Sequence, residues 1–222
     1  YGEPEKNVVM NKSGYIWDLC NRYGVTYRTY GEFMTGNKPA IASLDKHFHP
    51  TFPSYSLAIM DTTRLRIWKT EFQEMVKENR VPQFNSIRLG NDHTEGLRLG
   101  RPTPYAHVAD NDLAVGQLIE TLANSPIWNE SVVFIIEDDA QNGADHVDAH
   151  RSTAYVAGGF VKRNFIDHTA YTTSSMLRTM ELILGLNPMS QYDAAAMPMW
   201  RSFDSVAKPS DFKAISPNVD LQ

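Results

Sequence analysis

Residues 132–150 read VVFIIEDDAQNGADHVDAH, and this stretch indicates both a fold class and a site. Its first five residues are apolar without interruption, which is typical of a strand buried on both faces of a parallel sheet. The fourteen residues that follow contain five carboxylates and two histidines. Because neighbouring carboxylates repel each other unless a cation lies among them, the segment predicts a polar site at the end of a core strand.

Helical and strand patterns alternate on both sides of this stretch. Strands are predicted at 25–30, 84–89 and 153–158, where β-branched and aromatic residues gather. Helices are predicted from apolar residues at helical spacing, with Ser13 capping the first helix and Asp110 or Asn111 capping the third. This alternation predicts an α/β fold, a three-layer sandwich around a mostly parallel sheet. No repeat or linker divides the sequence, so we expect residues 1–222 to form a single domain.

The composition is that of an ordinary soluble globular chain. Of 222 residues, 42% are hydrophobic and 21% are charged, and the formal net charge is −5. Nothing in this charge pattern suggests a surface for nucleic acid, and no apolar stretch reaches the length of a transmembrane segment. Cys20 is the only cysteine, which excludes an intrachain disulfide and a thiolate metal cage.

A second polar cluster, NDHTEG at residues 91–96, follows the predicted strand 84–89. The carboxyl ends of parallel strands meet at one edge of a sheet, so both clusters are expected there. Carboxylate and imidazole ligands suit Zn²⁺, Mn²⁺ and similar divalent ions. The alternative is an acidic loop whose charges simply face water, and the residue types alone leave both readings open.

Several familiar site motifs do not fit. His146 and His150 have the spacing of a zincin pair, but Val147 occupies the position of the catalytic glutamate. An EF-hand loop starting at Asp138 fails at two ligand positions, and no G-x-S-x-G nucleophile motif is present. The segment GEFMTGNK at 31–38 resembles a phosphate-binding loop, but its lysine is out of register.

Taken together, the motifs resemble the bacterial phosphoesterase family. This family lies in the alkaline phosphatase superfamily and includes acid phosphatases and phospholipase-C-like enzymes. The resemblance covers roughly residues 82–205, and residues 13–35 fit it more loosely. It rests on NDHTEG (91–96), VADNDLAVGQLIETLANSPIW (108–128), VVFIIEDDAQNGADHVDAHRS (132–152) and SSMLRTMELILGLNPMSQYDAAAMPM (174–199).

The resemblance implies metal-dependent hydrolysis of phosphate esters with one or two divalent ions, Zn or Mn. It implies an alkaline-phosphatase-like fold, and its substrate would be a small phosphate ester or a phospholipid headgroup. A periplasmic or secreted location is likewise implied, whereas the expectation of no nucleic-acid partner rests on the charge pattern alone.

The resemblance also implies a set of metal ligands. Asp138 and Asp139 match the paired ligand position after a core strand, and His93 matches the histidine of the other metal site. His150 matches the last histidine ligand, with His146 as its competitor. Asp92 is a further candidate, although the superfamily often places its aspartate four residues before the histidine.

The sequence departs from the family pattern in its N-terminal part. In the family, an N-terminal half supplies a Glu-Asn or Asp metal ligand and then a Ser or Thr nucleophile, and neither is found here. We therefore expect this chain to be the C-terminal portion of a longer protein, to contribute no catalytic nucleophile and to be inactive when isolated. The N-terminal half of the same protein would then be the partner of this chain.

Two alternatives to this reading remain. The first is a non-catalytic binding domain that retains the phosphoesterase fold and uses the loop at 36–61 as its binding surface. The second is a different hydrolase that works through a metal-activated water and therefore needs no nucleophilic side chain.

Overall fold

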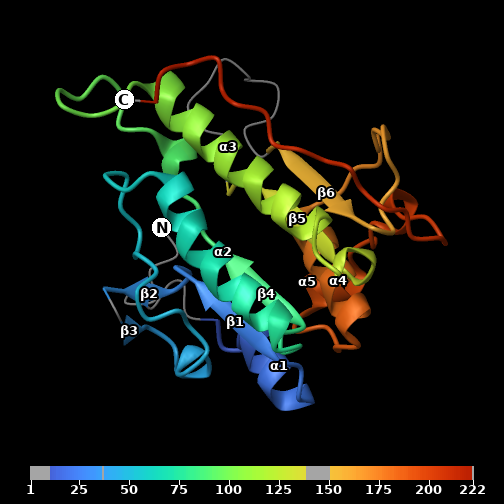
Figure 1. Ribbon diagram of the computed structural model, residues 1–222. Coiled ribbons are helices and arrows are strands. Elements are labelled where there is room, and N and C mark those ends of the chain that lie inside the picture. Colours follow the sequence, from blue (N-terminus) through green and yellow to red (C-terminus); the bar gives the residue numbers. More distant parts are fainter. Residues whose placement is uncertain (1–10, 37, 139–150, 222) are drawn as a thin grey trace. The chain divides into compact units, whose positions relative to one another are not determined.

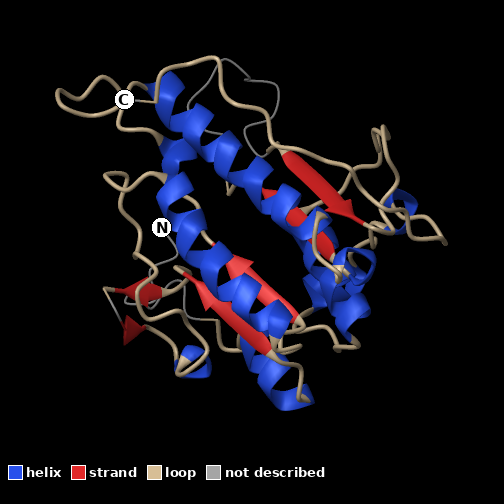
Figure 2. Ribbon diagram, viewed as in Figure 1, coloured by secondary structure: helices blue, strands red, loops and turns tan. Residues whose placement is uncertain are grey.

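The computed structural model describes residues 11–36, 38–138 and 151–221, and in these it shows a mixed α/β protein (Figure 1 and Figure 2). The chain divides into two compact units. The first comprises the described parts of 1–56, 66–88 and 168–200, and the second those of 57–65, 89–167 and 201–222. The α/β class is confirmed, whereas the three-layer sandwich and the single domain stay predictions.

A parallel pair of strands lies at the centre of the first unit. Strand β1 (Tyr27–Tyr30) pairs with β4 (Phe84–Ile87), with Tyr27 opposite Phe84. On its other side β1 forms an isolated parallel bridge between Thr29 and Phe48. Both strands were expected from their sequence patterns. The predicted parallel pairing is therefore present here, although over a small sheet.

The first unit contains a buried hydrophobic cluster to which its first helix contributes Trp17, Leu19 and Cys20. Helix α1 (Ile16–Tyr23) ends at Gly24, whose φ of 70° suits a residue without a side chain. The prediction that Ser13 caps this helix is wrong. Asp18 accepts a hydrogen bond from the N–H of Tyr15 at 2.7 Å, and this contact fixes the start two residues later.

The other elements of this unit are short or follow the predicted pattern. Helix α2 (Asp61–Lys77) has its first turn in the second unit. Helix α4 (Thr173–Leu184) ends at Gly185, as expected. The remaining elements are the antiparallel pair β2 (Met34–Thr35) and β3 (Lys38–Pro39), η2 (Ala42–Leu44) and α5 (Gln191–Ala195).

The second unit contains an antiparallel pair, β5 (Val132–Ile136) and β6 (Ala154–Gly158). Both strands were expected, but the burial of β5 on both faces was not confirmed. Its first four residues are half-buried and Ile136 is exposed, because β6 is the one strand that pairs with β5 in the described residues. The short helices η3 (Asn91–His93), η4 (Trp128–Glu130) and η5 (Trp200–Ser202) complete the described elements.

Helix α3 (Pro104–Ala123) begins earlier than the sequence suggested. Thr103 caps it by accepting the N–H of Ala106 at 3.2 Å, and Pro104 occupies the first turn, where its missing N–H costs nothing. The prediction that Asp110 or Asn111 caps this helix is therefore wrong, since both lie in its middle. Among the described helices, none combines the length and the apolar character needed to cross a bilayer.

Candidate metal centre

Two loops of the second unit carry the candidate ligands. The first leads from Leu89 into η3 and supplies Asp92 and His93. The second follows β5 directly and supplies Asp138. In the described residues β4 and β5 belong to separate two-stranded sheets, so the shared sheet edge expected from the sequence is not seen there.

The three side chains nevertheless converge. Nε2 of His93 lies 3.5 Å from Oδ1 of Asp138. One ligand atom from each of Asp92, His93 and Asp138 lies within 4.8 Å of the other two. Two carboxylates and an imidazole at this separation are a donor set that a divalent cation accepts.

The surroundings of Asp92 favour a cation beside it. Burial raises the pKa of Asp92, with the nearby Asp138 carboxylate adding to the rise and His93 opposing it. In addition, Asp92 Oδ1 is buried and receives no hydrogen bond from any residue that the structure describes. A buried carboxylate oxygen without a donor is costly, and a bound metal ion would remove that cost.

The other sequence-predicted ligands are not placed. Asp139, His146 and His150 all lie outside the described residues. The structure therefore brings together Asp92, His93 and Asp138 from the predicted set. Of these, Asp92 was the weakest candidate by sequence spacing, yet it lies within the group.

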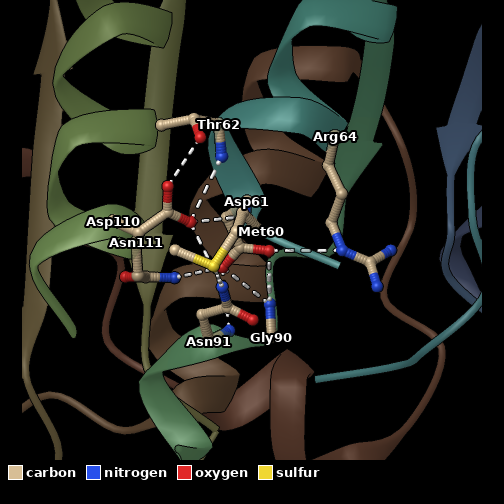
Figure 3. A network of polar contacts seen from close by, with 8 residues as sticks. All are labelled: Met60, Asp61, Thr62, Arg64, Gly90, Asn91, Asp110 and Asn111. Atoms are coloured by element: carbon tan, nitrogen blue, oxygen red, sulfur yellow. Dashed lines mark hydrogen bonds and ion pairs between the residues drawn. The ribbon is translucent and has the colours of Figure 1, made fainter. Parts of the chain in front are cut away.

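A buried polar network holds the loop that carries Asp92 and His93 (Figure 3). The carboxylate of Asp61 accepts the main-chain N–H of Gly90 at 3.1 Å and that of Asn91 at 2.8 Å. Asp61, Asn91 and Asp110 are all fully buried. Asp61 was missed in the sequence, and Asp110 was interpreted as a cap, because a polar residue inside a helix carries no local sign of its distant partner.

The sequence profile of the Phosphoesterase family matches residues 2–187. The chain belongs to the Phosphoesterase family. No curated protein sequence matches it.

A solved structure supports the fold of this phosphoesterase chain. It is a protein in the alkaline phosphatase superfamily from Vibrio parahaemolyticus, with a TM-score of 0.58 and 16% sequence identity. The similarity covers 88% of this chain and 54% of that one, so the chain spans about half the length of that protein. At this level of identity the similarity shows a shared fold.

Proposed function

We propose that the protein to which this chain belongs hydrolyses phosphate esters with the help of a divalent metal, and that Asp92, His93 and Asp138 form part of the metal centre. The observation that carries the proposal is the meeting of these three side chains in a chain of the Phosphoesterase family. The buried Oδ1 of Asp92, which accepts no hydrogen bond from the residues that the structure describes, supports it, because a cation would satisfy that atom.

We further propose Asp139, His150 and His146 as additional ligands, and Zn or Mn as the metal, with one or two ions. A bound ion supplies electrostatic stabilisation of the charge that develops on the phosphoryl oxygens. The residues of this chain would hold the ion, and the half-exposed Asp138 would leave one side of it open to a phosphate ester. A small phosphate ester or a phospholipid headgroup would fit this chemistry, in a periplasmic or secreted protein.

The nucleophile is proposed to come from a part of the protein outside these 222 residues. The chain covers 54% of the superfamily structure, which leaves room for further fold elements and for a hydroxyl nucleophile. The proposed whole is a three-layer alkaline-phosphatase-like sandwich, with this chain as its C-terminal portion. Accordingly, the isolated chain would bind metal and hydrolyse little or no substrate.

Metal content is the direct test. Wild-type protein and Asp138→Asn are equilibrated with Zn²⁺, Mn²⁺ or Ca²⁺, desalted and analysed by plasma mass spectrometry. We expect near-stoichiometric Zn or Mn in the wild type and a clear loss in the variant. Asp112→Asn is the matched control, since Asp112 is an exposed carboxylate on α3 outside the ligand group.

Hydrolysis of p-nitrophenyl phosphate, measured in parallel, separates the functional alternatives. Metal binding without turnover supports the proposal. Metal-dependent turnover by the isolated chain would instead favour a mechanism that uses a metal-activated water. Wild-type protein that takes up no metal would contradict the metal centre and favour a non-catalytic binding domain.

A further inference from the structure

We propose that Asp61 and Asp110 are positioning residues that hold Asp92 and His93 in the arrangement a metal ion requires. This inference rests on the proposed function, because it concerns the affinity and geometry of the same centre. Neither residue belongs to the candidate ligand group. Their contribution is made through the loop segment at residues 90–91.

Asp61 acts on the main chain directly before the ligands. Its carboxylate accepts the N–H groups of Gly90 and Asn91, so the two residues that precede Asp92 are held by hydrogen bonds to a charged group. Such hydrogen bonds are stronger than neutral ones. Because Asp61 is fully buried, water does not compete for these donors.

Asp110 joins the same loop to two helices. Its Oδ2 accepts the side-chain amide of Asn91 at 3.1 Å and the main-chain N–H of Asp61 at 2.5 Å. Its Oδ1 accepts the hydroxyl of Thr62 at 2.6 Å. Asp110 thereby connects α3, the first turn of α2 and η3, and Figure 3 shows all of these contacts converging.

The network is completed by one cationic side chain and one further neutral hydrogen-bond donor, both at Asp61. Arg64 Nε lies 3.3 Å from Oδ1 of Asp61, and Asn111 donates its side-chain amide to Oδ2 of Asp61 at 3.0 Å. Within the described part of the chain, the carboxylates of Asp61 and Asp110 contact N–H and O–H donors and Arg64, so they are occupied by the protein itself. They are suited to fixing a loop and poorly suited to binding a cation of their own.

Residues beyond the first ligands of a metal commonly orient those ligands, and their loss weakens metal binding by about 10–100-fold. Asn111→Ala tests this role with little disturbance of the fold, because Asn111 is only partly buried and contributes a single hydrogen bond to Asp61. Asn124→Ala is the matched control. It removes a side-chain amide that donates to the carbonyl of Glu120 at 2.8 Å, at the far end of the same helix.

The experiment measures the Zn²⁺ dissociation constant by competition with a chromophoric chelator, and the melting temperature of each metal-free protein. We expect Asn111→Ala to bind Zn²⁺ about tenfold more weakly than the wild type, and Asn124→Ala to match the wild type. Asp110→Asn is added as a stronger, isosteric variant. The visible spectrum of bound Co²⁺, which reports coordination geometry, is expected to change in Asp110→Asn and Asn111→Ala only.

The outcomes separate this inference from the proposed function. Wild-type protein that binds no metal would overturn both. Wild-type binding that persists with equal affinity and an unchanged Co²⁺ spectrum in Asn111→Ala and in folded Asp110→Asn would overturn the positioning role alone. In that case a lowered melting temperature would show that the network serves only stability.

Discussion

Nε2 of His93 lies 3.5 Å from Oδ1 of Asp138, although the two residues come from different loops of the chain. A protonated imidazole would form an ion pair with the carboxylate at this distance. A metal ion binds the neutral imidazole instead. The distance between the two side chains is therefore compatible with an ion pair in the metal-free protein and with two ligands of one metal ion.

Replacing His93 by Ala is expected to abolish stabilisation by zinc. A ligand that binds only the folded protein stabilises it by about 2.7 kcal/mol at a hundredfold excess over its dissociation constant. Wild-type protein should therefore melt several degrees higher with Zn²⁺ than without it, and His93→Ala should show little shift. Differential scanning calorimetry provides the measurement.

His168→Ala is the control for this prediction, because His168 is exposed and lies outside the ligand group. It should retain the full response to zinc. A full response in His93→Ala as well would place the zinc elsewhere.

Protein stability should fall as the pH rises from about 4.5 to about 7, because of Glu181 in α4. Burial raises the pKa of Glu181 from 4.5 to about 7; the adjoining Asp193 carboxyl adds to the rise and Arg178 opposes it. The folded state thus holds this proton more tightly than the unfolded state, and the resulting stability is lost through this window. The pKa of Asp193 is lowered to about 2, so its own contribution is already complete above about pH 4.

Urea unfolding at a series of pH values checks the role of Glu181. In Glu181→Gln the decline between pH 4.5 and 7 should become smaller, whereas Glu130→Gln, at an exposed position, should behave like the wild type. Equal slopes in all three proteins would mean that Glu181 titrates normally.

Alanine at position 158 is expected to destabilise the second unit strongly. A Cβ atom there would lie 2.3 Å from the carbonyl oxygen of Ser131 and 3.0 Å from Cα of Val132. Both are backbone atoms, so β5 and β6 would have to separate, at a cost of about 3 kcal/mol or more. The free energy of unfolding from denaturant titration gives the size of the effect.

Gly116→Ala offers a contrast at a second glycine of the same unit. Gly116 lies inside α3, and its added Cβ would lie 3.4 Å from Cβ of Ala214. The gain in helix propensity of up to about 1 kcal/mol should then outweigh this contact. A loss as large as that at position 158 would contradict the steric explanation.

Four strands (β1, β4, β5 and β6) and the C-terminal ends of helices α1 and α4 were predictable, because their signals are local. The apolar run at Val132–Ile136 and the glycines at 24 and 185 specify their elements through short-range patterning and backbone freedom. The antiparallel pairing of β5 with β6 was not predictable in the same way. Whether a strand pairs parallel or antiparallel depends on which strand lies beside it in the fold, and the apolar pattern of one strand does not indicate this.

The candidate site was predicted in part for the same reason. Asp138 and His93 lie in polar clusters that follow predicted strands, and the resemblance to the phosphoesterase family selected them within those clusters. The supporting network was not found, because the sequence Asp110-Asn111 fits a helix cap as well as a buried contact. Its partner Asp61 lies 49 residues away, and only folding brings the two together.

Gly90 and Asn91, the two residues before Asp92, donate hydrogen bonds to Asp61 and Asp110, and a few residues later the chain becomes exposed. Residues 96–101 are all exposed, and a Cβ added at Gly96 or at Gly100 would meet no atom within 4 Å. Exposed turns of this kind accept sequence changes and insertions with little effect on the rest of a protein. A fluorescent reporter or a randomised peptide inserted after Arg98 would thus be tethered a few residues from His93, making this turn an attachment point for sensors and for libraries that vary substrate choice.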